Sequence, residues 1–375
     1  NRRIELRLDV SNVESKIIEA GETVELIADV TEDFTITKNL TFDGAEKNYT
    51  GTMTVNTSLI VTVQNVNFVK GSITEAKGTG GNLTVKNCDF DGVDNSIAYA
   101  VTMRGGSSLT VDGCSAKNYD YGMLYIPSAV ANIAIKDVEV SNVAAAFNIS
   151  YSGDGTFENV ELDNVKYGLH VQNYGARTFT LNDCVMNNVD YPTYIQQKST
   201  AKVTFEFNNV LGYKETINSG SNQAKYGKYV LTSTAAKLTN VADDFNVTVS
   251  EDLADNGYVV EYNVENGVGT YSVVAGNIAL ERNGEIVKKF ATIQDAINAA
   301  QTGDKIVVLE DVDLSTNQLV TLDNSFNTYF KVEGKAVTID LNGKTINGES
   351  LKMTPISLCT YLLPRKASLS FEDSA

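Results

Sequence analysis

The sequence contains no tryptophan, one histidine and only four prolines. Tryptophan, which is common at interfaces, is therefore absent, and histidine, which is common at catalytic sites, is scarce. The four cysteines are Cys88, Cys114, Cys184 and Cys359. They form no CxxC pair, and no histidine lies near them in sequence, so we expect no zinc set and no bound metal. A chain of 375 residues can bury a sizeable core and needs no disulfide framework.

Dense basic clusters and long apolar segments are also missing. Acidic residues outnumber basic ones by 47 to 30, giving a formal net charge of -17. Such a charge repels nucleic acid and anionic membrane surfaces, and no apolar run approaches the roughly 18–20 residues of a spanning helix. We therefore expect no nucleic-acid partner and no membrane insertion. Because no signal peptide is present at Asn1, we also expect a processed or excised piece of a longer protein.

A repeat of 22–26 residues dominates the first two thirds of the chain. Small apolar residues recur at Val66, Cys88, Cys114, Val138, Val160 and Cys184. A polar column precedes them at Asn65, Asn87, Gly113, Asp137, Asn159 and Asp183. Apolar and polar residues alternate within each copy, which indicates strands with one buried face, and this period holds two or three such strands. Units of this kind must stack on their neighbours to bury their apolar faces.

A second polar column marks a turn in each copy. It begins at Gly92 and continues with Asn118, Asn142, Asn164 and Asn188. Stacked coils lie about 4.8 Å apart, so we expect these amides to link into a structural ladder. Asparagine also tolerates the left-handed backbone conformation of a sharp turn.

The turn sequences DGV, KNY, SNV, DNV and NNV, with strand starts YGM and YGL, resemble the right-handed parallel β-helix of the pectate-lyase-like superfamily. The resemblance covers residues ~20–235 and implies an all-β solenoid. An antiparallel β-sandwich would not explain an asparagine column at this period. The superfamily includes lyases, hydrolases, phage tailspikes and adhesins, so the fold alone does not decide the function.

The segment 290–314 predicts a helix followed by a strand. Ile293, Ala296, Ile297 and Ala300 have helical spacing, Gly303 ends the helix, and KIVVL is extended. Residues 10–34 have a similar layout, so we expect short helices that cap the solenoid ends. Residues 290–348 resemble adhesin-like repeat modules of large bacterial cell-surface proteins. We therefore expect a capped β-helix over 1–235, an irregular strand-rich connector over 236–275, and a helix cap with the first coils of a second, truncated module over 276–375.

Counting from the apolar residue after each turn asparagine places the next strand. Positions +4 and +6 should point inward: Ile97, Met123, Phe147, Leu169 and Thr193, then Tyr99, Tyr125, Ile149, Val171 and Ile195. Position +5 should point outward, at Ala98, Leu124, Asn148, His170 and Tyr194. His170 is therefore expected to be a solvated surface residue between Asn148 and Tyr194.

An enzymatic reading has little support in the residue pattern. A hydrolase of this superfamily would carry paired aspartates, a Gly-His-Gly stretch and an Arg-x-Lys, whereas His170 lies in GLHVQ and RxK is absent. A lyase would need clustered carboxylates for calcium and an arginine or lysine base. Arg104 and Arg177 are three coils apart, and Asp94 with Asp120 offers only a weak calcium site. We expect no catalytic residues and no cofactor.

Tyrosines provide the more distinctive surface. Tyr121, Tyr167 and Tyr191 share one column, and Tyr194 lies nearby. Exposed aromatic rows on a rigid solenoid suit contact with sugars or proteins, and these tyrosines with His170 are the candidate ligand-binding residues. We expect a non-catalytic extracellular or cell-surface module, adhesin-like, with a glycan or a host or neighbouring surface protein as partner. The alternatives are a polysaccharide lyase or glycoside hydrolase with an atypical site, and a phage tailspike or fibre.

Overall fold

The computed structural model describes residues 3–6, 21–56, 58–76, 80–94, 96–151, 153–214, 221–314, 320–322, 326–328, 330–347, 361–363 and 368–372. Internal contacts divide the chain into two compact units. Unit 1 comprises residues 1–247 with 264–270, and unit 2 comprises residues 248–263 with 271–375. Residues 7–20, in which the first capping helix is expected, lie outside the described residues.

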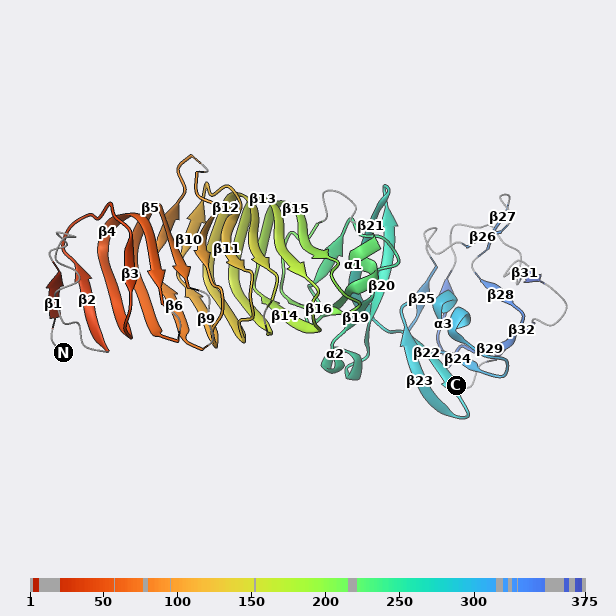
Figure 1. Cartoon of the computed structure of the whole chain (residues 1–375). Coiled ribbons are helices and arrows are strands. Elements are labelled where there is room, and N and C mark those ends of the chain that lie inside the picture. Colours follow the sequence, from red (N-terminus) through yellow and green to blue (C-terminus); the bar gives the residue numbers. More distant parts are fainter. Residues whose placement is uncertain are drawn as a thin grey trace. The chain divides into compact units, whose positions relative to one another are not determined.

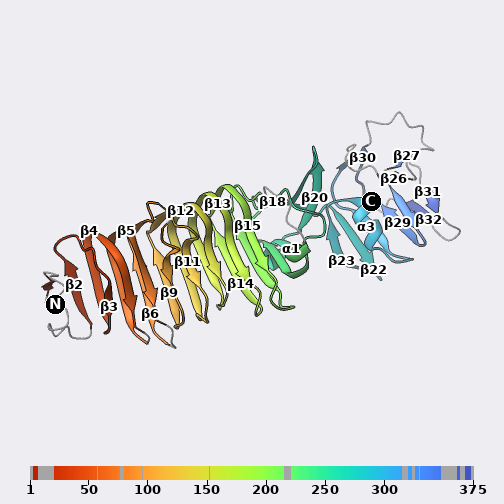
Figure 2. The ribbon, with the colours of Figure 1, turned by 45° about the horizontal axis from the view of Figure 1, so that its top comes forward.

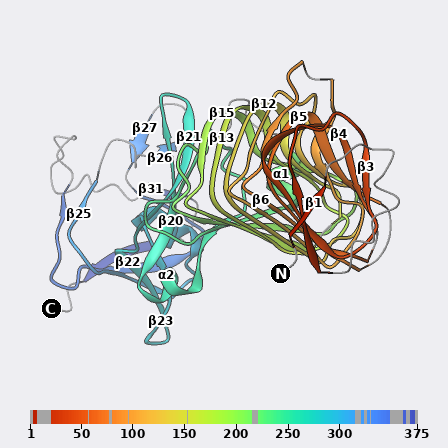
Figure 3. The same ribbon diagram turned by 90° about the vertical axis from the view of Figure 1, so that its left-hand side faces the viewer.

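Unit 1 is a parallel β-helix of about eight turns, as the repeat predicted. Successive coils lie side by side from β2 to β16 (Figure 1), and the turned view shows the same stack of parallel strands (Figure 2). Seen from the N-terminal side, the coils stack behind one another (Figure 3). The elements are β1 (Arg3–Leu6), β2 (Glu22–Leu26), β3 (Phe34–Ile36), β4 (Leu40–Val55), β5 (Ile60–Glu75), β6 (Asn82–Lys86), β7 (Asp89–Asp91), β8 (Tyr99–Thr102), β9 (Ser108–Asp112), β10 (Ser115–Lys117), β11 (Gly122–Ile126), β12 (Asn132–Ile149), β13 (Gly155–Gln172), β14 (Arg177–Asn182), β15 (Val185–Gln196), β16 (Val203–Asn208), α1 (Ser221–Tyr226) and β17 (Gly227–Leu231).

The predicted apolar column lies inside the solenoid. Register pairing sets Val138 beside Val160, and all six members, Val66, Cys88, Cys114, Val138, Val160 and Cys184, are buried. The three cysteines are free thiols among valines, as expected. Each coil therefore places the same repeat position inside the solenoid, and the stacked coils form one continuous core.

A row of aromatic rings fills the core of the later coils. Phe157, Phe179, Phe205 and Tyr229 come from successive coils, with centroid separations of 6.2, 6.0 and 5.4 Å along the row. Each of these side chains is fully buried. Gly155 is the register partner of Phe179, and a Cβ at residue 155 would lie 2.8 Å from the Phe179 ring. Because Gly155 has no side chain, the Phe179 ring has room to pack beside it.

The polar column before the apolar one occupies left-handed turns. Its six members have φ between +48° and +64°. Asn65 donates to Asp43, Asn159 donates to Asp137 and Asn209 donates to Asp183, through bonds of 3.1, 2.7 and 2.6 Å. Polar side chains at this corner therefore satisfy one another from coil to coil while their backbones turn.

The predicted register of the strands that begin at Tyr99 and Gly122 is wrong. The inward column is Val101, Leu124, Phe147, Leu169 and Thr193, and the outward column is Thr102, Tyr125, Asn148, His170 and Tyr194. Val101 comes eight residues after Val93 and Leu124 five after Tyr119, whereas the later coils take four. Because side chains alternate along a strand, these longer turns place Leu124 inside and turn Tyr125 outward.

Unit 2 combines a short helix with parallel strands. As the helical spacing predicted, α3 spans Ile293–Ala299, and its N-cap Thr292 accepts a bond from the Asp295 amide. Its apolar side packs in a buried cluster with Ile278, Leu280 and Ile306. Strands β24 (Lys305–Val308), β29 (Ala336–Asp340) and β32 (Ser368–Glu372) are parallel neighbours, the pairing that successive solenoid coils make. Strands β22 (Ile278–Arg282) and β23 (Glu285–Phe290) form an antiparallel hairpin.

The remaining elements are β18 (Lys237–Thr239), β19 (Val247–Val249), α2 (Glu251–Asp255), β20 (Tyr258–Glu265), β21 (Val268–Ala275), β22 (Ile278–Arg282), β23 (Glu285–Phe290), β24 (Lys305–Val308), β25 (Val312–Asp313), β26 (Val320–Leu322), β27 (Phe326–Thr328), β28 (Lys331–Glu333), β29 (Ala336–Asp340), β30 (Ile346–Asn347), β31 (Tyr361–Leu363) and β32 (Ser368–Glu372). Among the described residues, no helix has the length and apolar character needed to cross a membrane.

Glu75 is a buried carboxyl group whose protonation should affect stability. Burial raises its pKa to about 7, although backbone bonds near Gly105 and Arg104 oppose the shift. A raised pKa in the folded state gives stability that is fully present below the unfolded pKa and is lost as pH rises through 7. We expect Glu75→Gln to be more stable than the unmodified protein by up to about 3 kcal/mol at pH 8, and nearly equal to it at pH 4.5.

Urea unfolding at the two pH values checks this expectation, with Glu139→Gln on the exposed surface as the matched control. A gain from Glu75→Gln that is the same at both pH values would contradict a titrating Glu75.

Candidate functional site

Two aromatic clusters lie on the outer side of unit 1, and together they are termed the aromatic face. Its residues are Tyr99, Tyr121, Tyr125, Tyr167, His170, Tyr191 and Tyr194. They come from β8, from Tyr121 just before β11 and Tyr125 within it, and from the C-terminal halves of β13 and β15. Because these strands are parallel and in register, residues far apart in the sequence form one surface.

The first cluster consists of Tyr99, Tyr121 and Tyr125. The Tyr99 ring stacks on Tyr121 at 5.5 Å and on Tyr125 at 4.8 Å, with interplanar angles of 20° and 16°. Tyr121 is half exposed, at 51%. The expectation that Tyr99 and Tyr125 point inward is wrong, because the longer turns before their strands shift the register by the amounts given above. Sequence reasoning therefore missed two of the three rings in this cluster.

The second cluster contains Tyr167, His170, Tyr191 and Tyr194. Tyr167 and Tyr191 are register partners that stack at 5.3 Å and 22°. Tyr194 contacts Tyr167 at 4.8 Å and His170 at 5.1 Å. Tyr167 and Tyr191 thus cover one another along the solenoid, and Tyr194 meets His170 and Tyr191 edge to face. A ligand can stack only on a ring at the end of such a cluster.

His170 has the predicted register position between Asn148 and Tyr194. It is not a freely solvated residue, however, because Tyr167 and Tyr194 pack against its ring and its Nε2 is buried. Burial lowers the pKa of His170, and the positive charge of Lys198 lowers it further. The imidazole is therefore neutral near pH 7, with one donor and one acceptor nitrogen.

Asn148 connects the two clusters. Its Nδ2 donates a 2.8 Å hydrogen bond to the Tyr99 hydroxyl, two coils away. Within the part of the chain that the structure describes, neither Asn148 Oδ1 nor His170 Nε2 has a hydrogen-bond partner. Two buried polar atoms on adjacent coils are thus left with hydrogen-bonding capacity to offer.

The expected asparagine ladder contains one direct amide-to-amide bond. Asn164 Nδ2 donates to Asn142 Oδ1 at 2.8 Å. Asn118 donates instead to Asp91, and Asn188 donates to Asp163, each at 3.0 Å. All four asparagines have φ between +51° and +60°. The four asparagines therefore share the left-handed turn. The acceptor of the side-chain amide is an aspartate for Asn118 and Asn188 and an asparagine for Asn164.

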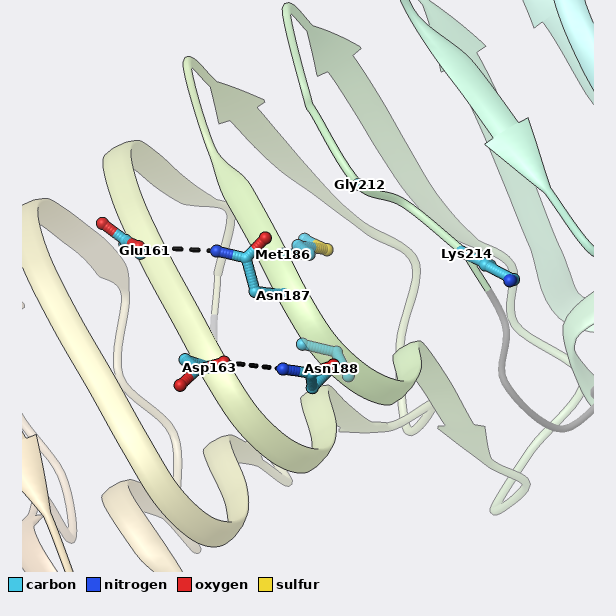
Figure 4. Close-up of a pocket in the computed structure, with 8 residues that line it drawn as sticks. Glu161, Asp163, Met186, Asn187, Asn188, Gly212 and Lys214 are labelled. Atoms are coloured by element: carbon cyan, nitrogen blue, oxygen red, sulfur yellow. Dashed lines mark hydrogen bonds between the residues drawn. The ribbon is translucent and has the colours of Figure 1, made fainter.

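A shallow polar groove follows this turn and adjoins the aromatic face. One part, of about 360 Å³, is lined by Asp120, Ala144, Lys166 and Asp190 together with the turn asparagines. The other part, of about 600 Å³, contains Glu161, Asp163, Asn187, Asn188 and Lys214. In Figure 4, Asn187 and Asn188 reach toward Glu161 and Asp163, and Lys214 extends from the next coil. The groove can therefore form several hydrogen bonds with a polyhydroxyl ligand.

Lys166 joins the groove to the second cluster. Its ammonium lies over the Tyr167 ring, 5.1 Å from the centroid, while Lys166 also lines the groove beside Asp190. Sequence spacing had brought Lys166 close to Asp190, but it gave no signal for Glu161, Asp163 and Lys214 as a group. Glu161 and Asp163 lie on β13, whereas Lys214 comes from a later coil and reaches the same groove only through the stacking register.

The residues considered for catalysis or calcium have other partners. Arg177 is buried and donates to the Ser150 and Gln172 carbonyl oxygens. Asp94 forms a 2.7 Å ion pair with Lys70, whose ammonium holds the pKa of that carboxyl at about 2. The described residues contain no group of three or more His, Cys, Asp or Glu side chains able to hold a metal ion.

Comparison with known families agrees with this geometry. Residues 72–243 match the family model of the right-handed β-helix region. The matched segment carries the coils of unit 1 from the end of β5 onward, and the earlier coils continue the same parallel stack, so unit 1 is a right-handed parallel β-helix. No curated protein matches the chain. The family match describes a fold shared by proteins of many functions, so the function has to be argued from the groove and the aromatic face.

Proposed function

We propose that this chain is a non-catalytic β-helix module of a bacterial surface protein that binds glycans outside the cell. The observation that carries the proposal is the aromatic face with its adjoining polar groove. Tyrosine, histidine and asparagine side chains offer uncharged hydrogen-bonding groups and ring surface, the combination that suits sugar hydroxyls and C–H faces. Parallel strands hold these side chains rigidly, so binding would cost little conformational entropy.

The same surface suits a protein partner less well. The core of a protein interface is apolar, fully buried on binding and depleted of charge. Here the ring edges carry hydroxyl groups, and the groove beside them contains Asp120, Glu161, Asp163, Lys166 and Asp190. The net charge of -17 also disfavours nucleic acid and anionic membranes.

Binding to an array of plant, bacterial and host glycans tests this proposal. Tyr121 is the most exposed ring of the aromatic face, so Tyr121→Ala should weaken binding at least about tenfold with little loss of stability. Tyr258→Ala in β20 of unit 2 is the matched control and should bind like the unmodified protein. If the unmodified protein binds no glycan on the array, the proposal is wrong.

The groove also supports a second candidate function, cleavage of the bound polysaccharide. Glu161 and Asp163 lie on one strand face, and Lys214 extends into the same groove, so acidic and basic groups gather as they do in glycan-cleaving sites. Incubation with the array's best ligand, followed by assays for new reducing ends and unsaturated products, separates the two functions. We expect no products; products that disappear in Glu161→Gln would instead establish an enzyme.

A further inference from the structure

The polar groove runs along the stacking direction of the coils. Its two parts share Asn188, so they form one continuous depression. Val165 pairs with Val143 on one side and with Val189 on the other, so neighbouring coils stay in register beneath the groove. Five successive coils each contribute a lining residue: Asp120, Ala144, Lys166, Asp190 and Lys214. At about 4.8 Å per coil, the four steps between these coils span about 19 Å.

The turn asparagines repeat one exposed amide per coil along the groove. Asn142, Asn164 and Asn188 all line it, and all three are exposed. Each amide has two N–H donors and a carbonyl oxygen with two lone pairs. The bond from Asn164 to Asn142 and the bond from Asn188 to Asp163 occupy only part of that capacity. The same hydrogen-bonding group is therefore offered to a ligand at each of these coil steps.

Tyrosines of the aromatic face border the groove. Tyr121, Tyr167 and Tyr191 each directly follow a residue that lines it. Tyr121 is 51% exposed, and the Lys166 ammonium lies over the Tyr167 ring. A sugar in the groove can therefore contact a tyrosine while its hydroxyl groups bind the asparagines.

Acidic side chains outnumber basic ones in the groove. Four carboxylates and two lysine ammonium groups line it: Asp120, Glu161, Asp163, Asp190, Lys166 and Lys214. A chain of uronic acids would bring a like charge close to these carboxylates with every residue, which is unfavourable. A neutral sugar chain avoids this repulsion, and its hydroxyl groups can donate to the carboxylates and accept from the lysines.

We propose that the polar groove holds one extended, unbranched chain of neutral sugars that runs parallel to the solenoid axis, with one sugar residue over each of the five coils. This proposal rests on the proposed glycan-binding function and identifies its ligand class. In a β-1,4-linked pyranose chain, each residue advances the chain by close to one coil spacing, so successive sugars meet equivalent turn positions. An α-1,4-linked chain curves and would leave a straight groove.

The dependence of affinity on chain length tests this arrangement directly. The probes are β-1,4-linked oligomers of glucose and of N-acetylglucosamine with two to six residues. Oligomers of α-1,4-linked glucose form the curved arm, and oligogalacturonates form the acidic arm. Isothermal titration calorimetry gives the affinities. We expect affinity for at least one β-1,4-linked series to rise with each added residue up to five and to level off at six.

Two variants change the groove at defined coils. Ala144 is half exposed on the second of the five coils, so Ala144→Trp fills the groove there and should lower affinity for the pentamer at least tenfold. Ala134→Trp adds the same side chain at an exposed position of the same strand outside the groove, and it should bind like the unmodified protein. Lys214→Ala removes the contact of the last coil, so affinity should level off at four residues instead of five.

Affinity that levels off at the dimer, or equal affinity for the α-1,4-linked series, would overturn the extended chain but leave glycan binding intact. Preference for oligogalacturonates would overturn the neutral ligand class. If no oligomer and no glycan on the array binds the unmodified protein, both proposals are wrong. If Ala144→Trp loses the circular dichroism spectrum of the unmodified protein, the length profile of Lys214→Ala decides, and a plateau that stays at five residues counts against the proposal.

Discussion

Replacing Phe179 by alanine is expected to lower the free energy of unfolding by about 3–5 kcal/mol, the usual cost of removing a fully buried aromatic ring. Phe179 lies in the middle of the interior aromatic row, between Phe157 at 6.2 Å and Phe205 at 6.0 Å. Its removal takes away both contacts and leaves a cavity that Gly155, its register partner, has no side chain to fill. Urea unfolding followed by far-ultraviolet circular dichroism measures the loss.

Two further variants make this measurement specific. Thr178→Ala, one residue earlier on a partly exposed position, should change stability by less than about 0.5 kcal/mol. Phe179→Leu keeps much of the volume and should fall between the other two. Each coil of a solenoid contacts mainly its neighbours. In Phe179→Ala, a protease should therefore cut first near residues 155–205 and only later in the N-terminal coils. A loss below about 1 kcal/mol for Phe179→Ala would show that the row is not packed as described.

Much of unit 1 was predictable because stacking repeats one environment in every coil. Val66, Cys88 and Cys114 occupy one inward column since their spacing, though irregular, always returns the chain to the same corner. The left-handed turns at Asn142, Asn164 and Asn188 follow for the same reason, since asparagine is one of the few residues that adopts this conformation readily. The repeat in the sequence therefore predicts both the buried column and the positions of the turns.

The register of the aromatic face was less predictable because it depends on turn lengths. Extra residues after Val93 and Tyr119 moved Tyr99 and Tyr125 to the outer side, and counting from the turn could not detect this. The number of residues in each turn becomes known only when the pairing of the strands in the structure is known. The column of Tyr167 and Tyr191 was found correctly because its two coils have turns of equal length.

The charge and burial of single side chains were the least predictable. Alternation correctly placed His170 on the outer side, but it could not show that Tyr167 and Tyr194 cover the imidazole. Likewise, Glu161 and Lys214 line one groove only because their coils stack on either side of the β15 coil. Outward side chains have no repeated core to constrain them, so their partners depend on neighbours that the repeat does not specify.

Replacing Gly122 by alanine is expected to be nearly as damaging as the loss of a core ring, at about 3 kcal/mol or more. A Cβ at residue 122 would lie 1.6 Å from the Ala145 carbonyl oxygen. Two non-bonded atoms cannot come this close, so the backbone would have to move. Gly122 pairs with Tyr99 in β8, and the preceding Tyr121 carbonyl accepts from the Ala145 amide. The substitution therefore has to separate β11 from β12 beside the first aromatic cluster.

Gly175→Ala is the matched control, because a Cβ at residue 175 meets no atom within 4 Å. It should leave stability unchanged or raise it slightly by restricting the unfolded chain. Thermal unfolding of the two variants gives the comparison, and glycan binding at a temperature where both are folded extends it to function. Gly122→Ala should weaken binding even in its folded form, since the adjacent Tyr121 would be displaced from its stack on Tyr99. Equal stability and equal binding of the two variants would contradict the close approach of β11 and β12 at Gly122.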